Sequence, residues 1–270
     1  MPVKLINTQC GLRKKNYPNT IQIGDVKTVY CRSLQNIDLL IGGSPCQGFS
    51  FAGKQLNFYD ERSELFFEYV RLLEECNPKY FLLENVKMKK EYQDVISGYL
   101  GVEPIEINSS LVSAQRRPRL YWTNIPEISP LQDKGIKIFD VIDLQKQRRI
   151  IKINYPETIR NTKNYAQYDQ SLKGHNSQDQ RYFYVDGKVN TITVSRSSIP
   201  KIKIGDSVYL CDADDVEIFQ TLPSRYTEGL SDGVRCELIG NGWTVDVIAH
   251  ILSHMQIGQV AQEEYRQIAI

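Results

Sequence analysis

Three stretches in the first third of the chain differ in how their apolar residues are spaced. Residues 38–41 (DLLI) and 80–83 (YFLL) are short, mainly apolar runs bounded by turn residues. Runs of this length are typical of strands that are buried on both faces of a parallel sheet. Between them, the apolar residues of 65–73 recur with the 3.6-residue period of a helix, which Asn77-Pro78 should end. The order predicts a βαβ unit with parallel strands and a right-handed crossover, and therefore an α/β protein.

The residues that follow these two predicted strands are candidates for chemistry. Pro45 and Cys46 come after the first strand, and Glu84 ends the second. Parallel strands place their carboxyl ends at one edge of the sheet, where open α/β sheets bind their ligands, so Cys46 and Glu84 should face the same crevice. A glutamate at a strand end is usually only solvated. Beside a thiol in a crevice, it is a candidate for acid–base catalysis.

Further elements are predicted up to residue 123. A helix should run from about Lys89 to Gly101, with Val95 and Tyr99 among its inward-facing residues. Residues 102–107 predict another strand. The run Arg117-Pro118-Arg119 then leads into a further apolar strand, and alternation should point both guanidiniums the same way. Such a pair suits a phosphate or a base carbonyl, although a solvated arginine cluster is the simpler interpretation.

The composition changes between residues 129 and 204. Asn, Gln, Lys, Tyr and Ser prevail there and apolar runs become rare, which fits a smaller domain of short strands or a set of solvated loops. A basic patch that includes Arg148 and Arg149 could contact phosphates. After residue 204 the α/β pattern returns. We therefore expect one domain of residues 1–128 plus 205–270 and a second domain of residues 129–204.

The last part of the chain predicts two helices and a turn. Asp212 should cap a helix that Pro223 ends, and residues 238–243 (LIGNGW) predict a turn before the final helix. His250 and His254 share one face of that helix at the spacing of a metal pair. No third ligand accompanies them, so no metal site is expected.

Composition and charge narrow the function only slightly. The 270 residues are 41% hydrophobic and 24% charged, with a net charge of +1, so binding to nucleic acid would need a local basic surface. The six cysteines form no CxxC pair, which argues against a zinc site or a disulfide framework and predicts reduced, buried thiols apart from Cys46. No apolar run is long enough to span a bilayer and no hydrophobic signal segment follows Met1, so we expect a cytoplasmic protein.

Short motifs of the chain, taken in order, resemble those of the cytosine-C5 DNA methyltransferases of bacteria and phages. They are Gly24-Asp25-Val26, Pro45-Cys46-Gln47, Glu84-Asn85-Val86, Gln115-x-Arg117-x-Arg119 and Gly240-Asn241-Gly242. Each is weak alone, but together they occur in the family's order. The resemblance covers about residues 16–256. It implies a Rossmann-like methyltransferase sheet, with a smaller, mostly β target-recognition domain at residues 129–204, and a place in DNA methylation or restriction–modification in a bacterial or phage-infected cell.

The resemblance implies a mechanism for the candidate residues. Cys46 would add to C6 of a cytosine flipped out of double-stranded DNA, which activates C5 toward the methyl group of S-adenosylmethionine. Glu84 would protonate N3 of the base, while Arg119, with Arg117 nearby, would steady the base carbonyl and the thiolate. The residues implied to bind the cofactor are Asp25 at its adenine, Asn241 at its methionine end, Pro45 and Gly242. The residues implied to bind the substrate are Gln47, Gly48, Ser50, Asn85 and Gln115.

One departure from the family leaves two classes of function open. Members begin with a strand and a Phe-x-Gly-x-Gly turn for the cofactor, whereas this sequence has Lys14-Lys15-Asn16 almost at once. The chain would then be a clipped enzyme or one subunit of a split enzyme whose second polypeptide supplies the missing strands. Alternatively, it is a catalytically inactive, methyltransferase-like DNA-binding or regulatory subunit. The retained Cys46, Glu84 and Arg119 favour an enzyme, ahead of a tRNA methyltransferase or a thiol redox enzyme.

Overall fold

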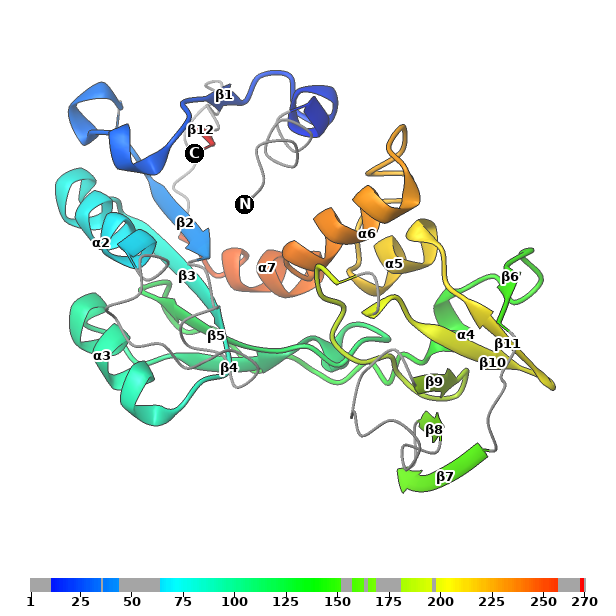
Figure 1. Ribbon diagram of the computed structural model, residues 1–270. Helices are drawn as coiled ribbons and strands as arrows, with labels where there is room; N and C mark the ends of the chain where they lie inside the picture. The colour runs from blue at the N-terminus through cyan, green and yellow to red at the C-terminus, as the bar shows by residue number, and fades with distance from the viewer. Residues whose placement is uncertain are drawn as a thin grey trace. The chain divides into compact units, whose positions relative to one another are not determined.

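The computed structural model describes residues 11–34, 36–43, 64–151, 157–162, 165–168, 181–195, 198–256 and 268–269 (Figure 1). The chain forms two compact units. Of the described residues, those within 10–107, 118–129 and 251–270 form the four-stranded unit, and those within 108–117 and 130–250 form the six-stranded unit. Residues 205–250, which were expected in the first domain, lie in the six-stranded unit together with residues 130–204. The functional division into a catalytic and a recognition domain stays a prediction.

The four-stranded unit is built on one mixed sheet with the strand order β2-β3-β5-β4 (Figure 1). Its elements are β2 (Leu39–Gly43), α2 (Glu64–Cys76), β3 (Tyr80–Val86), α3 (Lys90–Leu100), β4 (Ile105–Asn108) and β5 (Pro118–Thr123). Strands β2 and β3 are parallel, which confirms the predicted βαβ pairing, and β5 adds antiparallel to β3. Gly101 ends α3 in the left-handed conformation that glycine adopts without strain.

The core of this unit lies between the sheet and its helices. Buried apolar side chains from α2, β3, α3 and β5 form it: Phe66, Tyr69, Val70, Phe81, Leu83, Ile96, Leu100, Leu120 and Trp122, together with Met88. The buried Trp122 indole N–H donates to Ser97 Oγ at 3.0 Å, so its polar group is satisfied inside the core.

Two details of the predicted core are wrong. Strand β2 is a terminal strand of the four-stranded sheet as described, and Ile41 is 37% exposed, so this strand is not buried on both faces. On α3, Val95 and Tyr99 are exposed because the stripe that meets the sheet is narrow and is filled by Ile96 and Leu100.

Part of a short N-terminal region, the residues of two 3-10 helices, packs on α2. The region comprises β1 (Ile21–Gln22), η1 (Val26–Thr28) and η2 (Cys31–Ser33), and β1 pairs in parallel with β12 (Ile268–Ala269). Arg71 Nη2 of α2 donates to the Val26 carbonyl at 3.0 Å. Cys31 and Cys76 are partly exposed, so the expectation of buried thiols is wrong for them, whereas Cys211 and Cys236 are buried.

The six-stranded unit contains one sheet and several helices. Its strand order is β6-β11-β10-β9-β8-β7. The strands are β6 (Arg149–Ile150), β7 (Glu157–Thr162), β8 (Tyr165–Tyr168), β9 (Arg181–Tyr184), β10 (Lys201–Ile204) and β11 (Ser207–Leu210). The helical elements are η4 (Ser109–Leu111), α4 (Ile138–Val141), α5 (Ala213–Phe219), α6 (Asp232–Asn241) and the first six residues of α7 (Val245–Leu252), which crosses the boundary between the units after residue 250. Short strands therefore do occur in the polar region, and they share a core with α5 and α6 that includes Phe183, Ile202, Phe219 and Ile239.

Candidate active site

Strands β3 and β5 hold the two charged residues of the candidate active site in the four-stranded unit. Glu84 pairs with Tyr121 and Val86 pairs with Arg119, so the Glu84 and Arg119 side chains are diagonal neighbours on one face of the sheet. Arg119 Nε lies 2.7 Å from Glu84 Oε1, and the two side chains are only 12% and 11% exposed. Water is largely excluded from this ion pair, so the contact is a strong, charge-assisted hydrogen bond that fixes both groups.

The register of β2 against β3 bears on the candidate nucleophile. Gly43, the last residue of β2, pairs with Glu84 in the parallel ladder. The chain therefore leaves β2 next to Glu84 and continues toward Cys46. Cys46 lies outside the described residues, as do the other site residues predicted around it, namely Pro45, Gln47, Gly48 and Ser50. Their proximity to Glu84 stays a prediction.

Asn85 follows Glu84 in β3 and points to the other face of the sheet because successive strand residues alternate. It is buried, and its Oδ1 accepts from the Val86 N–H at 2.8 Å. Contact of Asn85 with a substrate stays a prediction. The hydrogen bond from Val86 joins two residues of β3.

Arg117 and Arg119 belong to different compact units, because the chain passes from one unit to the other between Arg117 and Pro118. Arg117 is 4% exposed. Its guanidinium donates to the carbonyls of Ile192 at 2.7 Å, Gly240 at 3.1 Å and Gly242 at 2.8 Å. The two guanidiniums therefore bind different groups and do not point at a common one as the alternation predicted.

Gln115 is also buried in the six-stranded unit. Its Nε2 donates to the Phe219 carbonyl at 3.1 Å and to Gln220 Oε1 at 3.0 Å, while its Oε1 accepts from the Ile192 N–H at 2.9 Å. Gln220, which the sequence analysis did not single out, donates in turn to the carbonyls of Ile239 and Gly242. A glutamine after a helix carries no local signal for such a role, so only the contacts reveal it.

The predicted turn at Gly240 and Asn241 is wrong, because both residues are the last turn of α6 and Gly242 follows as its C-cap. A Cβ on Gly240 would lie 2.3 Å from the Thr193 carbonyl oxygen, so glycine is required there by close packing rather than by a turn. Asn241 itself is exposed. The structure thus brings Gly242 together with Arg117 and leaves Asn241 accessible.

Asp25 lies in the four-stranded unit as the N-cap of η1. Its Oδ1 accepts from the Lys27 N–H at 3.0 Å, and the residue is exposed. Because Asp25 is exposed, its second carboxylate oxygen, Oδ2, is accessible from solvent. A cofactor contact through Asp25 stays a prediction.

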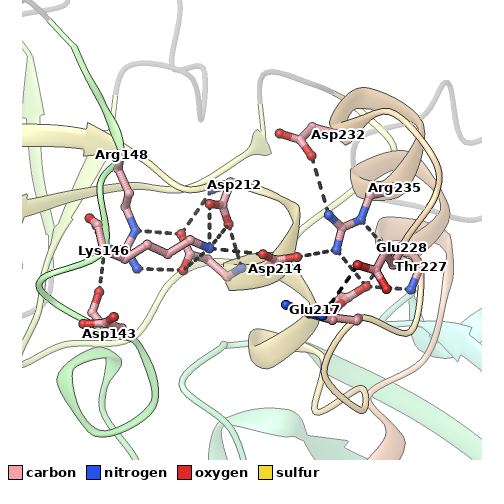
Figure 2. A network of polar contacts seen from close by, with 12 residues as sticks. Asp143, Lys146, Arg148, Asp212, Asp214, Glu217, Thr227, Glu228, Asp232 and Arg235 are labelled. Atoms are coloured by element: carbon pink, nitrogen blue, oxygen red, sulfur yellow. Dashed lines mark hydrogen bonds and ion pairs between the residues drawn. The ribbon is translucent and has the colours of Figure 1, made fainter.

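The basic patch predicted around Arg148 is in part a buried ion network at the start of α5 (Figure 2). Arg148 makes a bidentate contact with Asp215, with Nε–Oδ2 and Nη2–Oδ1 distances of 2.8 Å, and its side chain is fully buried. This contact raises the pKa of Arg148 further above its ordinary value. Arg148 is therefore not available to DNA phosphates, whereas Arg149 is exposed.

No cluster of three or more His, Cys, Asp or Glu residues suited to a metal ion occurs among the residues that the structure describes. None of the helices described is long and apolar enough to cross a membrane.

Comparisons with known proteins agree on one family. A family model described as C-5 cytosine-specific DNA methylase matches residues 6–95. The orphan methyltransferase M.SPRI of Bacillus phage SPR is 49% identical over 152 residues, which cover 50% of this chain and 34% of the relative. The type II methyltransferase M1.ScrFI of Lactococcus lactis subsp. cremoris is 29% identical over 265 residues, which cover 86% of this chain and 65% of the relative. The chain thus spans less than two thirds of the length of these curated relatives.

A solved structure shows the same fold. The methyltransferase EhMeth of Entamoeba histolytica has a TM-score of 0.65 at 17% identity, and the match covers 90% of this chain and 85% of EhMeth. This likeness supports a Rossmann-like methyltransferase fold for the α/β chain described above. Over residues 6–95 and over the stretches that these relatives match, the chain is similar to C-5 cytosine-specific DNA methyltransferases.

Proposed function

We propose that this chain carries out methyl transfer to C5 of cytosine in double-stranded DNA. The observation that carries the proposal is the buried pair of Glu84 and Arg119, next to the end of the strand that leads to Cys46. A carboxyl group held in a fixed direction beside a cysteine is what activation of a cytosine ring requires. The similarity to C-5 cytosine-specific DNA methylases supports the same reaction class.

Cys46 is the proposed nucleophile. C5 of cytosine is a weak nucleophile, so the Cys46 thiolate adds to C6 and moves an electron pair toward C5. Bound S-adenosylmethionine would supply the electrophilic methyl group. Once C5 is methylated, loss of its proton to a base re-forms the C5–C6 double bond and breaks the C6–S bond, so Cys46 leaves as the thiolate. The ring is inaccessible within a duplex, so the cytosine has to be flipped out, and Gln47, Gly48 and Ser50 are proposed to lie on the loop that contacts it.

Glu84 and Arg119 are proposed to act on the opposite side of the ring. Glu84 would bind the N3 and amino edge and protonate N3, which draws charge from the ring as Cys46 adds. Arg119 Nε fixes Glu84 at 2.7 Å, so the carboxyl group needs little reorganisation when the base arrives. Arg119 would also lie near the base carbonyl.

The residues proposed for the cofactor fit its chemistry. Asp25 presents an exposed carboxylate that can accept from the adenine amino group, and Asn241 presents an exposed amide that can bind the amino-acid end. Pro45 and Gly242 are proposed as neighbouring contacts.

Duplex DNA that contains 5-fluorocytosine tests this function. Fluorine cannot leave C5 as a proton does, so the attacking thiol stays attached after methyl transfer, and the complex survives a denaturing gel. We expect Cys46→Ala to abolish the complex and the control Cys76→Ala, at a partly exposed thiol on α2, to keep it. A complex that persists in Cys46→Ala would remove Cys46 from the mechanism.

The same assay separates the enzyme from the alternative of an inactive DNA-binding or regulatory subunit. Such a subunit would bind the duplex yet form no covalent complex at any cofactor concentration. One subunit of a split enzyme would form the complex only after a second polypeptide is added, and that partner stays a prediction.

A further inference from the structure

The two arginines of the Gln115-x-Arg117-x-Arg119 motif make different contacts, and this difference suggests different functions. We infer that Arg117 is a positioning residue for the cofactor side of the site: it holds the backbone on both sides of Asn241, whereas Arg119 acts at the base. The inference rests on the proposed function and deepens it.

The first observation is what the Arg117 guanidinium binds. One nitrogen, Nη2, donates to the carbonyls of Gly240 at 3.1 Å and Gly242 at 2.8 Å, which are the residues on either side of Asn241. These carbonyls belong to the last turn and the C-cap of α6, where the helix leaves its carbonyl groups without internal partners. A cation at this end also offsets the negative end of the helix dipole. Arg117 therefore caps α6.

The second observation is that neighbouring polar groups fix Arg117 itself. Its Nη1 donates to the Ile192 carbonyl at 2.7 Å, and the N–H of Ile192 donates to Gln115 at 2.9 Å. Gln220 binds the Gly242 carbonyl from another direction, at 3.3 Å. Since Ile192 and Gly240 are buried, moving the guanidinium away would remove the donor that it provides to their carbonyl groups, at a cost for each. Arg117 is thus held in place by the unit it stabilises.

The third observation is the state of Asn241. The carbonyls of its two neighbours, Gly240 and Gly242, both accept from Arg117 Nη2. Gly240 also packs directly against the Thr193 backbone. The Asn241 side chain is exposed. A rigid backbone with an accessible amide is the arrangement expected of a residue that binds a ligand of amino-acid type with an ammonium and a carboxylate, such as the methionine end of S-adenosylmethionine.

Arg119 provides the matched comparison. Its Nε lies 2.7 Å from Glu84 in the four-stranded unit, and a chain crossing at Pro118 separates it from Arg117. A lysine at either position keeps the charge but offers one point donor in place of a planar fork. The variants Arg117→Lys and Arg119→Lys therefore make the same chemical change at two different sites.

The test compares methyl transfer and amide hydrogen exchange in these variants of the full chain. We expect Arg117→Lys to raise KM for S-adenosylmethionine about tenfold or more, the effect of one charged hydrogen bond, with kcat changed only a few-fold. Arg119→Lys should lower kcat at saturating cofactor. The amide hydrogens of residues 239–244 should exchange faster in Arg117→Lys than in the wild type. Their exchange rates should be the same in Arg119→Lys as in the wild type. Because Arg117 acts through Asn241, the effects of Arg117→Lys and Asn241→Ala on KM should not add.

Two results would overturn the inference. One is a lowered kcat in Arg117→Lys with an unchanged KM for the cofactor, which would place Arg117 at the base. The other is unchanged exchange of residues 239–244 in Arg117→Lys. If the wild-type chain neither forms the fluorocytosine complex nor transfers a methyl group, the proposed function fails, and the exchange data alone then decide whether Arg117 holds this segment. If Arg117→Lys does not fold, the Asn241→Ala variant tests the inference instead. An unchanged KM for S-adenosylmethionine in Asn241→Ala would mean that Asn241 does not bind the cofactor, and the inference would then fail.

Discussion

Gly240 and Gly98 are both glycines in helices, yet alanine should have opposite effects on them. Gly98 lies in α3 and an added Cβ would meet nothing within 4 Å, whereas at Gly240 in α6 it would lie 2.3 Å from the Thr193 carbonyl oxygen and 2.5 Å from its carbon. Helix propensity alone favours alanine at both positions, by up to about 1 kcal/mol. The close contact with Thr193 therefore decides whether Gly240→Ala raises or lowers the free energy of unfolding.

The size of the effect at Gly240 follows from how far the backbone must move. A carbon atom normally approaches an oxygen no closer than about 3.3 Å, so α6 and Thr193 would have to separate by about 1 Å. Overpacking of this kind costs about 1–3 kcal/mol. The same shift weakens the 3.1 Å bond from Arg117 to the Gly240 carbonyl, a charged hydrogen bond worth about 1.5–3 kcal/mol. After the gain in propensity, we expect Gly240→Ala to lose about 2–4 kcal/mol.

Urea denaturation followed by circular dichroism measures both variants against the wild type. Gly98→Ala should raise the midpoint slightly, and Gly240→Ala should lower it by an amount that corresponds to its predicted loss. The two glycines lie in different compact units. If the units unfold in separate transitions, Gly98→Ala should shift only that of the four-stranded unit and Gly240→Ala only that of the six-stranded unit. A Gly240→Ala midpoint equal to or above that of the wild type would refute the close packing of Gly240 on Thr193.

Further predictions concern the ion network at the start of α5 and the exposed Arg149. Arg148→Met should lower the free energy of unfolding by about 3–5 kcal/mol because it leaves Asp215 charged and buried, and thermal unfolding measures the loss. Arg149→Ala should change stability little and should flatten the salt dependence of DNA binding if Arg149 contacts phosphate; an unchanged slope would mean that it faces solvent. Arg235 lowers the pKa of Asp214, so the charged carboxylate stabilises the fold above its unfolded pKa of about 4, and this contribution is lost as the pH falls through the lower folded value. The deficit of Asp214→Asn in urea midpoint should therefore be present at pH 7 and shrink in acid, and a deficit that grows in acid would contradict this sign.

The parts of the fold that sequence predicted well depend on local signals. The apolar runs at β2 and β3 and the periodic stretch of α2 fix a βαβ unit because each element is defined by its own residues. The glycine after α3 marks its end for the same reason. Glu84 and Arg119 could also be named as candidates, since each stands in a recognisable short motif.

What sequence did not reveal depends on contacts between distant segments. Glu84 meets Arg119 because β5 adds antiparallel to β3 in a register that no local pattern specifies. Gly240 looks like a turn residue, but it ends a helix and packs on Thr193. Arg148 looks like a phosphate ligand, but its partner is Asp215, a residue far along the chain. In each case the residue type indicated a special role, but the group that the residue contacts could not be predicted from the sequence.

The spacing of the two motif arginines has a physical consequence of its own. Two guanidiniums separated by one residue repel each other unless each is offset by negative charge. Arg119 is offset by the Glu84 carboxylate, whereas Arg117 is offset by the partial charges of the carbonyls at the end of α6. The carboxylate is a group that can take part in proton transfer, and main-chain carbonyls are not. The chemistry of the partners therefore supports the proposal that Arg119 acts at the reacting base and Arg117 in the scaffold, although the sequence presents them as a pair.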